Sequence, residues 1–309
     1  MADLSHCLRR NLHRLPVDID LIVGVPRSGM LVANMLALDL NLKVTDVEGF
    51  CSNRPLTPEN TRSIPRSRFD TPREARHVLV IDDSVSSGQS MREVRRQVGE
   101  AGGAQRVTYC AVYSTIAAPA DVDVSLEVVP DPRTFEWNIL HRPLLEKFCV
   151  DIDGVLCVDP TDAQNDDGDA YLAFLATASP LALPTYRVGH LVTSRLEKYR
   201  AQTEDWLASH GVEFKHLHML DLPDAQTRRR LGCHAQFKAQ VYRECAETVL
   251  FVESEREQAR KIALESGKTA LCYTTQEVFQ PGVTYRAVSA KSKTVVAKAK
   301  RFVARTLGR

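Results

Sequence analysis

Short apolar runs that end in polar or glycine-containing turns and lead into helical segments recur along this sequence, and they limit the folds open to it. In the first half, residues 20–24, 77–81 and 106–113 have the length and β-branching of buried strands. Residues 30–40 and 90–99, which follow two of these strands, have helical patterns. Strands that alternate with helices form parallel sheets, which bind ligands at the carboxyl ends of their strands.

The same alternation starts again at Phe148. Further strands are expected at residues 189–193, 248–252 and 269–273, with helices at 197–210 and 255–266. A chain of 309 residues is long enough for two domains of ordinary size. We therefore predict two doubly wound α/β domains with parallel sheets, residues 1–145 and 146–285, followed by a basic tail, residues 286–309.

The composition narrows the class of protein. A hydrophobic share of 44%, a charged share of 26% and a net charge of +1 describe a globular chain with no overall attraction to nucleic acid. The eight cysteines have neither zinc-ligand nor Cys-x-x-Cys spacing, which favours a reducing cytoplasm. No apolar run approaches the roughly 20 residues that span a bilayer, and no signal-like segment is seen at the N-terminus.

The first candidate site follows the strand at residues 77–81, which ends in two carboxylates, Asp82 and Asp83. Their oxygens suit sugar hydroxyls or Mg²⁺. The turn after them can direct backbone N–H groups and hydroxyls into one concavity at a helix N-terminus, which is a phosphate cradle. Its residues are Ser86, Ser87, Gly88, Gln89 and Ser90. The plain alternative is an acidic turn that caps a helix.

This segment resembles the phosphoribosyl diphosphate signature of type I phosphoribosyltransferases, in which a hydrophobic strand, an Asp pair, a short spacer, a glycine and a hydroxyl residue follow one another. The resemblance implies that residues 86–90 hold the 5-phosphate and that Asp82 and Asp83 hold the ribose diol. Residues 24–29, Gly-Val-Pro-Arg-Ser-Gly, lie where that family has its diphosphate loop, and so implicate Arg27.

Two further segments bear on the first site. Residues 51–72 are rich in proline and arginine and lie where the family has a mobile catalytic loop, although a solvated loop without a catalytic part stays open. Arginine suits a diphosphate because its fork binds two oxygens, but the sequence does not say which arginine acts. Trp137, Asn138 and His141 are candidates for an acceptor pocket, and Trp137 equally suits a seal between domains.

The second candidate site begins with Asp151-Ile-Asp153-Gly, directly after an apolar strand. Strand alternation places both carboxylates on one side, where they can share Mg²⁺ while one attacks phosphorus and the other transfers protons. Later strand ends add hydroxyls, cations and acids to this edge. They are Thr193, Ser194, Arg195, Lys238, Glu253 and Glu255. For Asp151-Ile-Asp153 the alternative is an acidic turn, and for Lys238 it is an exposed helix lysine.

This order of motifs resembles the haloacid dehalogenase superfamily of phosphatases. The resemblance implies that Asp151 is the nucleophile, that Asp153 is the general acid and base, and that Thr193 and Lys238 stabilise the phosphoryl group. Ser194 and Arg195 are then substrate-binding residues. Mg²⁺ would be held by Asp151 and Asp153 with Glu253 or Glu255, a choice left open by the unusual Glu-Ser-Glu spacing. Residues 159–188 are too few for a large cap domain, so the cap is expected to be minimal and the site open to large substrates.

The tail carries seven Lys or Arg residues and no acid between residues 291 and 309, with apolar residues at helical spacing. This pattern predicts a basic amphipathic helix on an anionic membrane surface, with a solvated tail as the alternative. The protein is thus expected in the cytoplasm, peripheral to the inner face of the membrane.

Two such sites in one chain suggest consecutive steps, transfer of 5-phosphoribose to an acceptor and removal of the 5-phosphate. Both domains together resemble the bifunctional glycan phosphoribosyltransferase–phosphatases that install ribofuranose in bacterial surface polysaccharides such as lipopolysaccharide. The resemblance implies phosphoribosyl diphosphate, Mg²⁺ and a lipid-linked glycan acceptor. Two alternatives remain, a nucleobase or small-molecule phosphoribosyltransferase joined to a nucleotide phosphatase, and a phosphoribosyl diphosphate sensor joined to a phosphatase domain. The oligomeric state, including a homodimer, is left open.

Overall fold

The computed structural model describes residues 2–57, 67–131 and 133–282. The chain divides into two compact units on either side of the peptide bond between Trp137 and Asn138. The predicted C-terminal helix, residues 286–309, lies outside the described residues. Within the described part, no helix has both the length and the apolar character needed to cross a membrane.

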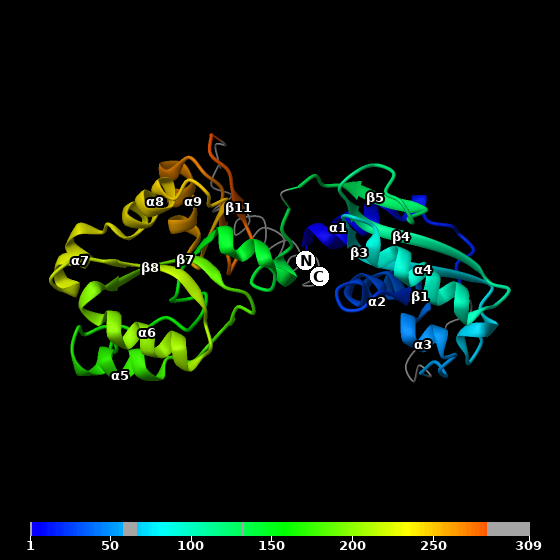
Figure 1. The fold of residues 1–309 in the computed structure, drawn as a ribbon, viewed down its shortest axis with the longest axis horizontal. Helices are drawn as coiled ribbons and strands as arrows, with labels where there is room; N and C mark the ends of the chain where they lie inside the picture. The colour runs from blue at the N-terminus through cyan, green and yellow to red at the C-terminus, as the bar shows by residue number, and fades with distance from the viewer. Residues whose placement is uncertain (1, 58–66, 132, 283–309) are drawn as a thin grey trace, which may run out of the picture. The chain divides into compact units, whose positions relative to one another are not determined.

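The first unit contains a parallel five-stranded sheet (Figure 1). Its strand order is β2-β1-β3-β4-β5. The strands are β1 (Leu21–Gly24), β2 (Lys43–Asp46), β3 (His77–Val85), β4 (Arg106–Ser114) and β5 (Val124–Val128). The helices are α1 (Ala2–Asn11), α2 (Gly29–Leu40), α3 (Val47–Cys51) and α4 (Gln89–Ala101), with short 3₁₀ turns at Leu12–Arg14, Pro72–Glu74 and Glu136–Asn138.

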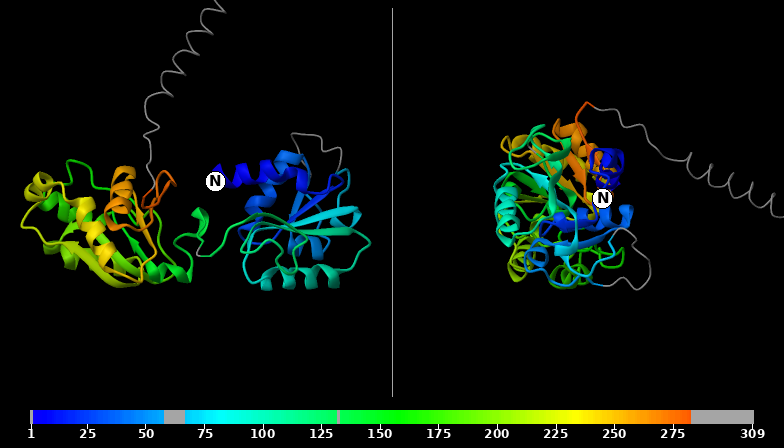
Figure 2. Two further views of the ribbon diagram at one scale, coloured as in Figure 1. Left: turned by 90° about the horizontal axis from the view of Figure 1, so that it is seen from above. Right: turned by 90° about the vertical axis from the view of Figure 1, so that its right-hand side faces the viewer.

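Helices cover both faces of this first sheet (Figure 1, Figure 2). Leu79 and Val80 are neighbours on β3, and successive side chains of a strand point to opposite faces. Leu79 is fully buried in a core that includes residues of α1 and α2, whereas Val80 is fully buried in a core that includes residues of α3 and α4. The apolar run that predicted this strand therefore reflects burial on both sides.

The second unit contains a six-stranded sheet in the order β11-β10-β9-β6-β7-β8, in which only β11 is antiparallel to its neighbour among the described strands. The strands are β6 (Phe148–Val150), β7 (Val188–Leu196), β8 (Phe214–Leu220), β9 (Leu250–Glu253), β10 (Ala270–Cys272) and β11 (Val278–Phe279). The helices are α5 (Asp169–Thr177), α6 (Arg200–Ser209), α7 (Ala225–Leu231), α8 (His234–Glu244) and α9 (Arg256–Ser266), with 3₁₀ turns at Pro143–Lys147 and Glu197–Tyr199. One core joins the sheet to α5 and α6, and another joins it to α8 and α9.

Each sheet reverses its strand order once. In the first unit the chain goes from β1 outward to β2 and returns with β3 on the other side of β1. In the second unit it goes from β6 through β7 to β8 and returns with β9 on the other side of β6. The carboxyl ends of the strands at such a switch point form the crevice in which doubly wound sheets bind ligands. The acids Asp82 and Asp83 lie near the end of β3, and Asp151 follows β6 next to β9.

The prediction of α/β architecture with parallel sheets is confirmed, and the structure places the domain division earlier than residue 145. Ile139, Leu140 and Leu145 are buried in the core of the second unit together with Val150. This short segment is therefore held by the apolar contacts of the sheet that follows it in the chain.

Candidate active sites

The first site brings the loop after β1 against the acid pair on β3. The Ser28 hydroxyl donates a hydrogen bond of 2.8 Å to Asp83 Oδ1. Gly29, the first residue of α2, lies so close to the pair that an added Cβ would be 2.9 Å from Asp82 Oδ1. A side chain at this position would displace Asp82. Arg27 is exposed in the same loop, so the predicted diphosphate-binding residue and the acid pair share one edge of the sheet.

Asp82 and Asp83 are both buried, with 7% and 3% of their surface exposed. Burial raises the pKa of Asp82 to about 8, and the neighbouring charge of Asp83 adds to the effect. Asp82 Oδ1 accepts the Asp83 backbone N–H at 2.8 Å. A cationic or hydroxyl-bearing ligand at this position is favoured, because it would stabilise a carboxylate that the protein otherwise leaves poorly solvated.

Trp137 belongs to this site through its indole nitrogen. Its N–H donates a hydrogen bond of 2.9 Å to Asp83 Oδ2, and its ring stacks on Phe135 at 5.0 Å between ring centres. This bond directs the polar edge of the Trp137 indole at the acid pair. The sequence predicted Trp137 as a wall of the acceptor pocket and did not indicate the bond. Asn138 and His141, the other predicted pocket residues, belong to the second unit, where His141 contacts Thr185.

The predicted phosphate cradle forms the turn between β3 and α4. Gly88 has a positive φ of 78° directly before the helix, a backbone conformation that favours glycine. The side chains of Ser86, Ser87, Gln89 and Ser90 are exposed around it. The N-terminus of a 13-residue helix carries a partial positive charge, and exposed hydroxyls beside it suit an anionic ligand.

The arginine-rich loop is described only at its two ends. Arg54 pairs with Asp46 at 3.0 Å, and Asp46 also caps α3. Arg68 is exposed, whereas Arg62 and Arg66 lie outside the described residues. Arg54 therefore has a structural partner, and the identity of a catalytic arginine stays a prediction.

Comparison with known proteins bears on this first unit. Residues 3–142 match the family described as "Phosphoribosyl transferase domain". The first unit is thus similar to this family over nearly all of its length. Among curated proteins, this chain is 31% identical over 91 residues to the transcriptional regulator GfcR of Methanococcoides burtonii, covering 29% of this chain and 43% of the relative. It is 29% identical over 123 residues to GfcR of Halobacterium salinarum, covering 39% and 54%. The chain thus spans about half the length of the curated relatives it matches.

Solved structures give similar matches. The xanthine-guanine-hypoxanthine phosphoribosyltransferase of Helicobacter pylori is 20% identical with a TM-score of 0.33, over 45% of this chain and 88% of that one. The purine phosphoribosyltransferase of Pyrococcus horikoshii is 18% identical with a TM-score of 0.29, over 43% and 90%.

The second site centres on a buried lysine between two buried acids. Lys238 Nζ donates to Asp151 Oδ2 at 2.6 Å and to Glu253 Oε2 at 2.7 Å. Burial strongly raises the pKa of Asp151, while Lys238 opposes that rise. Burial works against the charged form of Lys238, but the two carboxylates outweigh it and raise its pKa. Lys238 is therefore a fixed cation beside Asp151, and its charge favours the ionised form of that buried carboxyl group.

Glu253 and Glu255 occupy different places. Glu253 is fully buried at the end of β9, and its second oxygen accepts the N–H groups of Ser254 at 3.0 Å and Glu255 at 3.2 Å. Glu255 is exposed directly before α9. Of the two, Glu253 is the acid that shares Lys238 with Asp151, and Glu255 lies at the edge of the site.

Of the two adjacent hydroxyl residues on β7, Ser194 lines the second site and Thr193 does not. Thr193 is fully buried, and its Oγ1 accepts the Arg195 backbone N–H at 3.2 Å. Ser194 lines a cavity of about 330 Å³ together with Asp151 and Lys238. Its Oγ has no hydrogen-bond partner within the described residues. The role predicted for Thr193 therefore stays a prediction, and Ser194 is a second candidate for the phosphoryl-binding hydroxyl.

Arg195 does not contact the cavity as a substrate-binding residue would. It is 1% exposed and donates to Asp153 with two nitrogens, at 2.6 Å and 3.1 Å to Oδ1. The second oxygen of Asp153 keeps only a 3.2 Å contact to Arg195 Nε. Arg195 thus fixes the predicted proton-transfer residue from behind, because a bidentate pair restricts the orientation of a carboxylate.

The same cavity contains residues that the motifs did not indicate. They include Asp159, Tyr171, Arg228 and His234. Burial raises the pKa of Asp159. Arg228 donates to the Ser194 carbonyl at 3.0 Å. Asp159 lies in a polar loop, and Arg228 is one of three consecutive arginines. The local sequence around either residue therefore gives no sign of a role in the site.

The cavity fits Mg²⁺ in its donor chemistry, because Mg²⁺ prefers carboxylate oxygens. Asp151, Glu253 and Asp159 line it and are the residues that would hold the ion. Lys238 Nζ lies between Asp151 and Glu253. Among the described residues, the oxygens of Asp151, Glu253 and Asp159 do not all lie within 4.8 Å of one another. An ion held here would therefore share Asp151 and Glu253 with Lys238.

Proposed function

We propose that this protein is a bifunctional enzyme that transfers 5-phosphoribose from phosphoribosyl diphosphate to an acceptor and then removes the 5-phosphate. The observation that carries the proposal is the Asp151–Lys238–Glu253 cluster at the switch point of a second sheet, in one chain with a phosphoribosyl transferase domain. Transfer leaves a phosphate on C5 of the added ribose, and the cluster suits removal of such a group.

In the transfer step, an acceptor oxygen bonds to C1 of ribose as the bond from C1 to diphosphate breaks and the acceptor proton passes to solvent. Asp83, oriented by Ser28 and Trp137, accepts hydrogen bonds from ribose hydroxyls together with Asp82. The turn at residues 86–90 holds the 5-phosphate, and Arg27 faces the departing diphosphate. Arg27 thereby stabilises the negative charge that develops on the departing diphosphate.

In the hydrolysis step, an Asp151 oxygen attacks phosphorus and the C5 oxygen leaves with a proton from Asp153. Asp153 then takes a proton from water, which attacks the aspartyl phosphate and releases inorganic phosphate. Asp153 Oδ2 carries the weaker Arg195 contact and is the oxygen we assign to proton transfer. Ser194 donates to a phosphoryl oxygen, and Lys238 offsets its charge. Bound at these carboxylates, Mg²⁺ supplies further positive charge against the phosphoryl group.

We propose a lipid-linked glycan as the acceptor. Between β6 and β7 the chain contains one helix, α5, whose Phe174 and Leu175 are buried in the core of the unit. The described residues thus contain no separate cap domain at this position, which suits a phosphate attached to a large molecule. The basic tail, residues 286–309, would direct the protein to an anionic membrane surface where such acceptors reside.

A second candidate function is favoured by one finding, the match to relatives named as transcriptional regulators. In this alternative the first unit binds phosphoribosyl diphosphate as a signal and transfers nothing. Asp82 and Asp83 serve binding in both cases, so their presence does not separate the two.

Product analysis separates these functions. The protein is incubated with phosphoribosyl diphosphate, Mg²⁺ and either lipid-linked oligosaccharides or free nucleobases, and the products are identified by mass. The proposal predicts a ribosylated oligosaccharide without phosphate. Products on nucleobases alone would contradict the glycan acceptor, and binding of phosphoribosyl diphosphate without any product would favour the sensor.

A further inference from the structure

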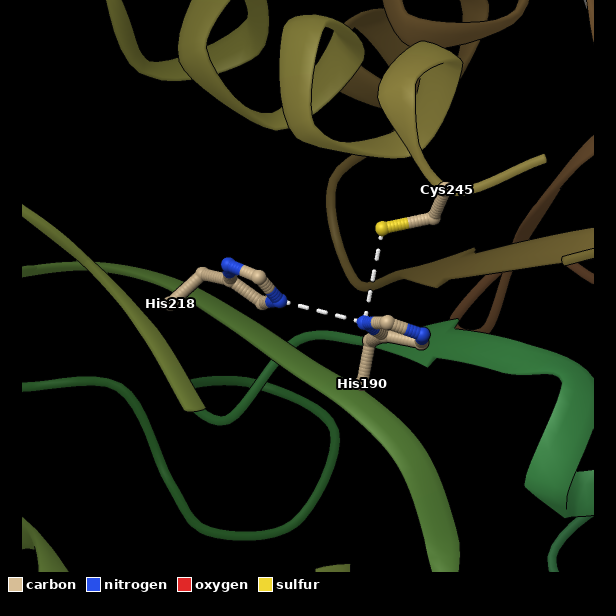
Figure 3. A group of neighbouring side chains, drawn as sticks. All are labelled: His190, His218 and Cys245. Atoms are coloured by element: carbon tan, nitrogen blue, oxygen red, sulfur yellow. Dashed lines mark hydrogen bonds between the residues drawn. The ribbon is translucent and has the colours of Figure 1, made fainter. Parts of the chain in front are cut away.

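A cluster of histidine and cysteine side chains in the second unit lies apart from both candidate sites. His190 on β7, His218 on β8 and Cys245 directly after α8 turn toward one another (Figure 3). None of the three lines the Asp151 cavity. Within the described residues, this is the group of three whose ligand atoms all lie within 4.8 Å of one another.

Two of the three ligand distances in the cluster are close to those around a tetrahedral metal ion. His190 Nδ1 lies 3.1 Å from His218 Nε2 and 3.4 Å from Cys245 Sγ. With Zn–N bonds of about 2.1 Å and Zn–S bonds of about 2.3 Å, neighbouring tetrahedral ligands lie about 3.4–3.6 Å apart. For these two pairs a Zn²⁺ ion requires shifts of a few tenths of an ångström, and the third pair, His218 and Cys245, lies within 4.8 Å.

The surroundings prepare the His190 ring to bind a metal. Its Nε2 lies 3.0 Å from Glu247 Oε1, and a carboxylate only accepts hydrogen bonds, so Nε2 carries the proton. Nδ1 then offers its lone pair to the cluster. A carboxylate behind a metal-binding histidine fixes its tautomer and raises its basicity. The His216 ring stacks on His190 at 4.7 Å and supports its orientation.

Cys245 is also suited to bind a metal. It is partly buried directly after α8, and its Sγ lies 3.4 Å from His190 Nδ1. Lys268 lies nearby, but its Nζ is bound to the carbonyl oxygens of Tyr242 and Cys245 and to Thr248 Oγ1. The Lys268 ammonium group is thus held by three oxygen atoms.

We propose that His190, His218 and Cys245 bind one transition-metal ion of the Zn²⁺ class, which links β7, β8 and the end of α8. Two imidazoles and one thiolate form the soft donor set that selects Zn²⁺ over Mg²⁺. The site is separate from the proposed Mg²⁺-dependent chemistry, so its test does not depend on the proposed function. The ligands come from three elements, which explains why cysteine spacing gave no zinc signal.

The test uses the purified full-length protein, reduced and metal-free, with Co²⁺ as a spectroscopic probe and Zn²⁺ as competitor in excess Mg²⁺. We expect one equivalent of Co²⁺ with tetrahedral ligand-field bands and a thiolate-to-metal charge-transfer band, both lost when Zn²⁺ is added. Cys245→Ser should remove the charge-transfer band, and His218→Gln should weaken Zn²⁺ binding at least tenfold. His210→Gln and Cys233→Ser are matched controls that should change neither, because His210 packs on Trp206 at the end of α6 and neither residue belongs to the cluster.

A milder substitution keeps the test informative if the ligand variants fail to fold. Glu247→Gln removes only the carboxylate behind His190, so it should keep the charge-transfer band and weaken binding by roughly 10- to 100-fold. Absence of tight Zn²⁺ binding in the reduced wild-type protein would overturn the proposal. Binding without a charge-transfer band, unaffected by Cys245→Ser, would equally overturn it, because the ion would then lie at other ligands such as the Asp151 cavity.

Discussion

The indole N–H of Trp137 donates a hydrogen bond of 2.9 Å to the Asp83 carboxylate. The bond connects the end of the first unit to the acid pair on its central strand. Ser28 holds the other oxygen of the same carboxylate. Asp83 is therefore oriented from two sides, and Trp137 is part of the first candidate site.

Replacing Trp137 with phenylalanine tests this relationship. Phenylalanine keeps the stacking on Phe135 and removes only the N–H donor. A hydrogen bond to a charged group contributes about 1.5–3 kcal/mol, so Trp137→Phe should weaken phosphoribosyl diphosphate binding or transfer by roughly 10- to 100-fold. Hydrolysis of a model phosphate ester should not change. Trp206→Phe is the control, because Trp206 bonds to the Ala178 carbonyl in the second unit; an equal loss of binding in both variants would contradict the role of Trp137.

Ser194 and Thr193 offer a direct comparison between the structure and the motif-based prediction. Ser194→Ala should lower phosphate ester hydrolysis by roughly 10- to 100-fold, since it removes a donor to the phosphoryl group. It should not destabilise the fold, because the Ser194 hydroxyl has no hydrogen-bond partner within the described residues. Thr193→Val should leave hydrolysis within a few-fold of wild type. The opposite pattern, with Thr193 essential for hydrolysis and Ser194 dispensable, would show that Thr193 is the residue that binds the phosphoryl group.

The lysine between Asp151 and Glu253 should be essential for stability as well as for hydrolysis. Lys238→Met leaves two buried carboxylates without their cation, and breaking a buried ion pair costs about 3–5 kcal/mol. We expect the free energy of unfolding of the second unit to fall by that order in urea denaturation, with hydrolysis abolished. Lys215→Met, which removes a partly exposed pair with Glu146, should cost at most about 1 kcal/mol. An unchanged free energy of unfolding in Lys238→Met would contradict the buried ion pairs of Lys238 with Asp151 and Glu253.

The raised pKa of Asp82 predicts a pH dependence of stability. Its pKa rises from 3.8 in the unfolded chain to about 8 in the folded protein, so the folded state binds a proton more tightly between these values. This stabilisation is complete below pH 3.8 and is lost as the pH rises through 8. Asp82→Asn should therefore be more stable than wild type, with a difference that grows up to about pH 8 and then levels off, as urea denaturation without ligands can measure. A difference that shrinks with rising pH would contradict the burial of Asp82.

Much of the fold was predictable because its central strands are apolar on both faces. The runs at residues 77–81 and 248–252 lie in the middle of their sheets, where both sides are buried. Strands β2, β5 and β8 were not predicted, because they lie toward sheet edges and contain half-buried or exposed residues. Periodicity detects burial, and edge strands show less of it.

The candidate sites were predictable where a strand end carries a local motif, as at Asp82 and Asp151. Contacts between distant segments were not. The pairing of Asp153 with Arg195, the entry of Asp159 into the cavity and the bond from Trp137 to Asp83 depend on tertiary packing. A motif gives the residue types at a strand end, but which of two neighbouring hydroxyls faces the cavity depends on the register of the strand.

The central claim is that the second site consumes the product of the first. Mass analysis of the Asp151→Asn variant, incubated with phosphoribosyl diphosphate, Mg²⁺ and the lipid-linked acceptor, tests it most directly. The account predicts a ribosylated product that is heavier by one phosphate than the wild-type product, and its conversion to the wild-type mass when a first-site variant carrying Asp82→Asn and Asp83→Asn is added. Identical products from wild type and Asp151→Asn would contradict it.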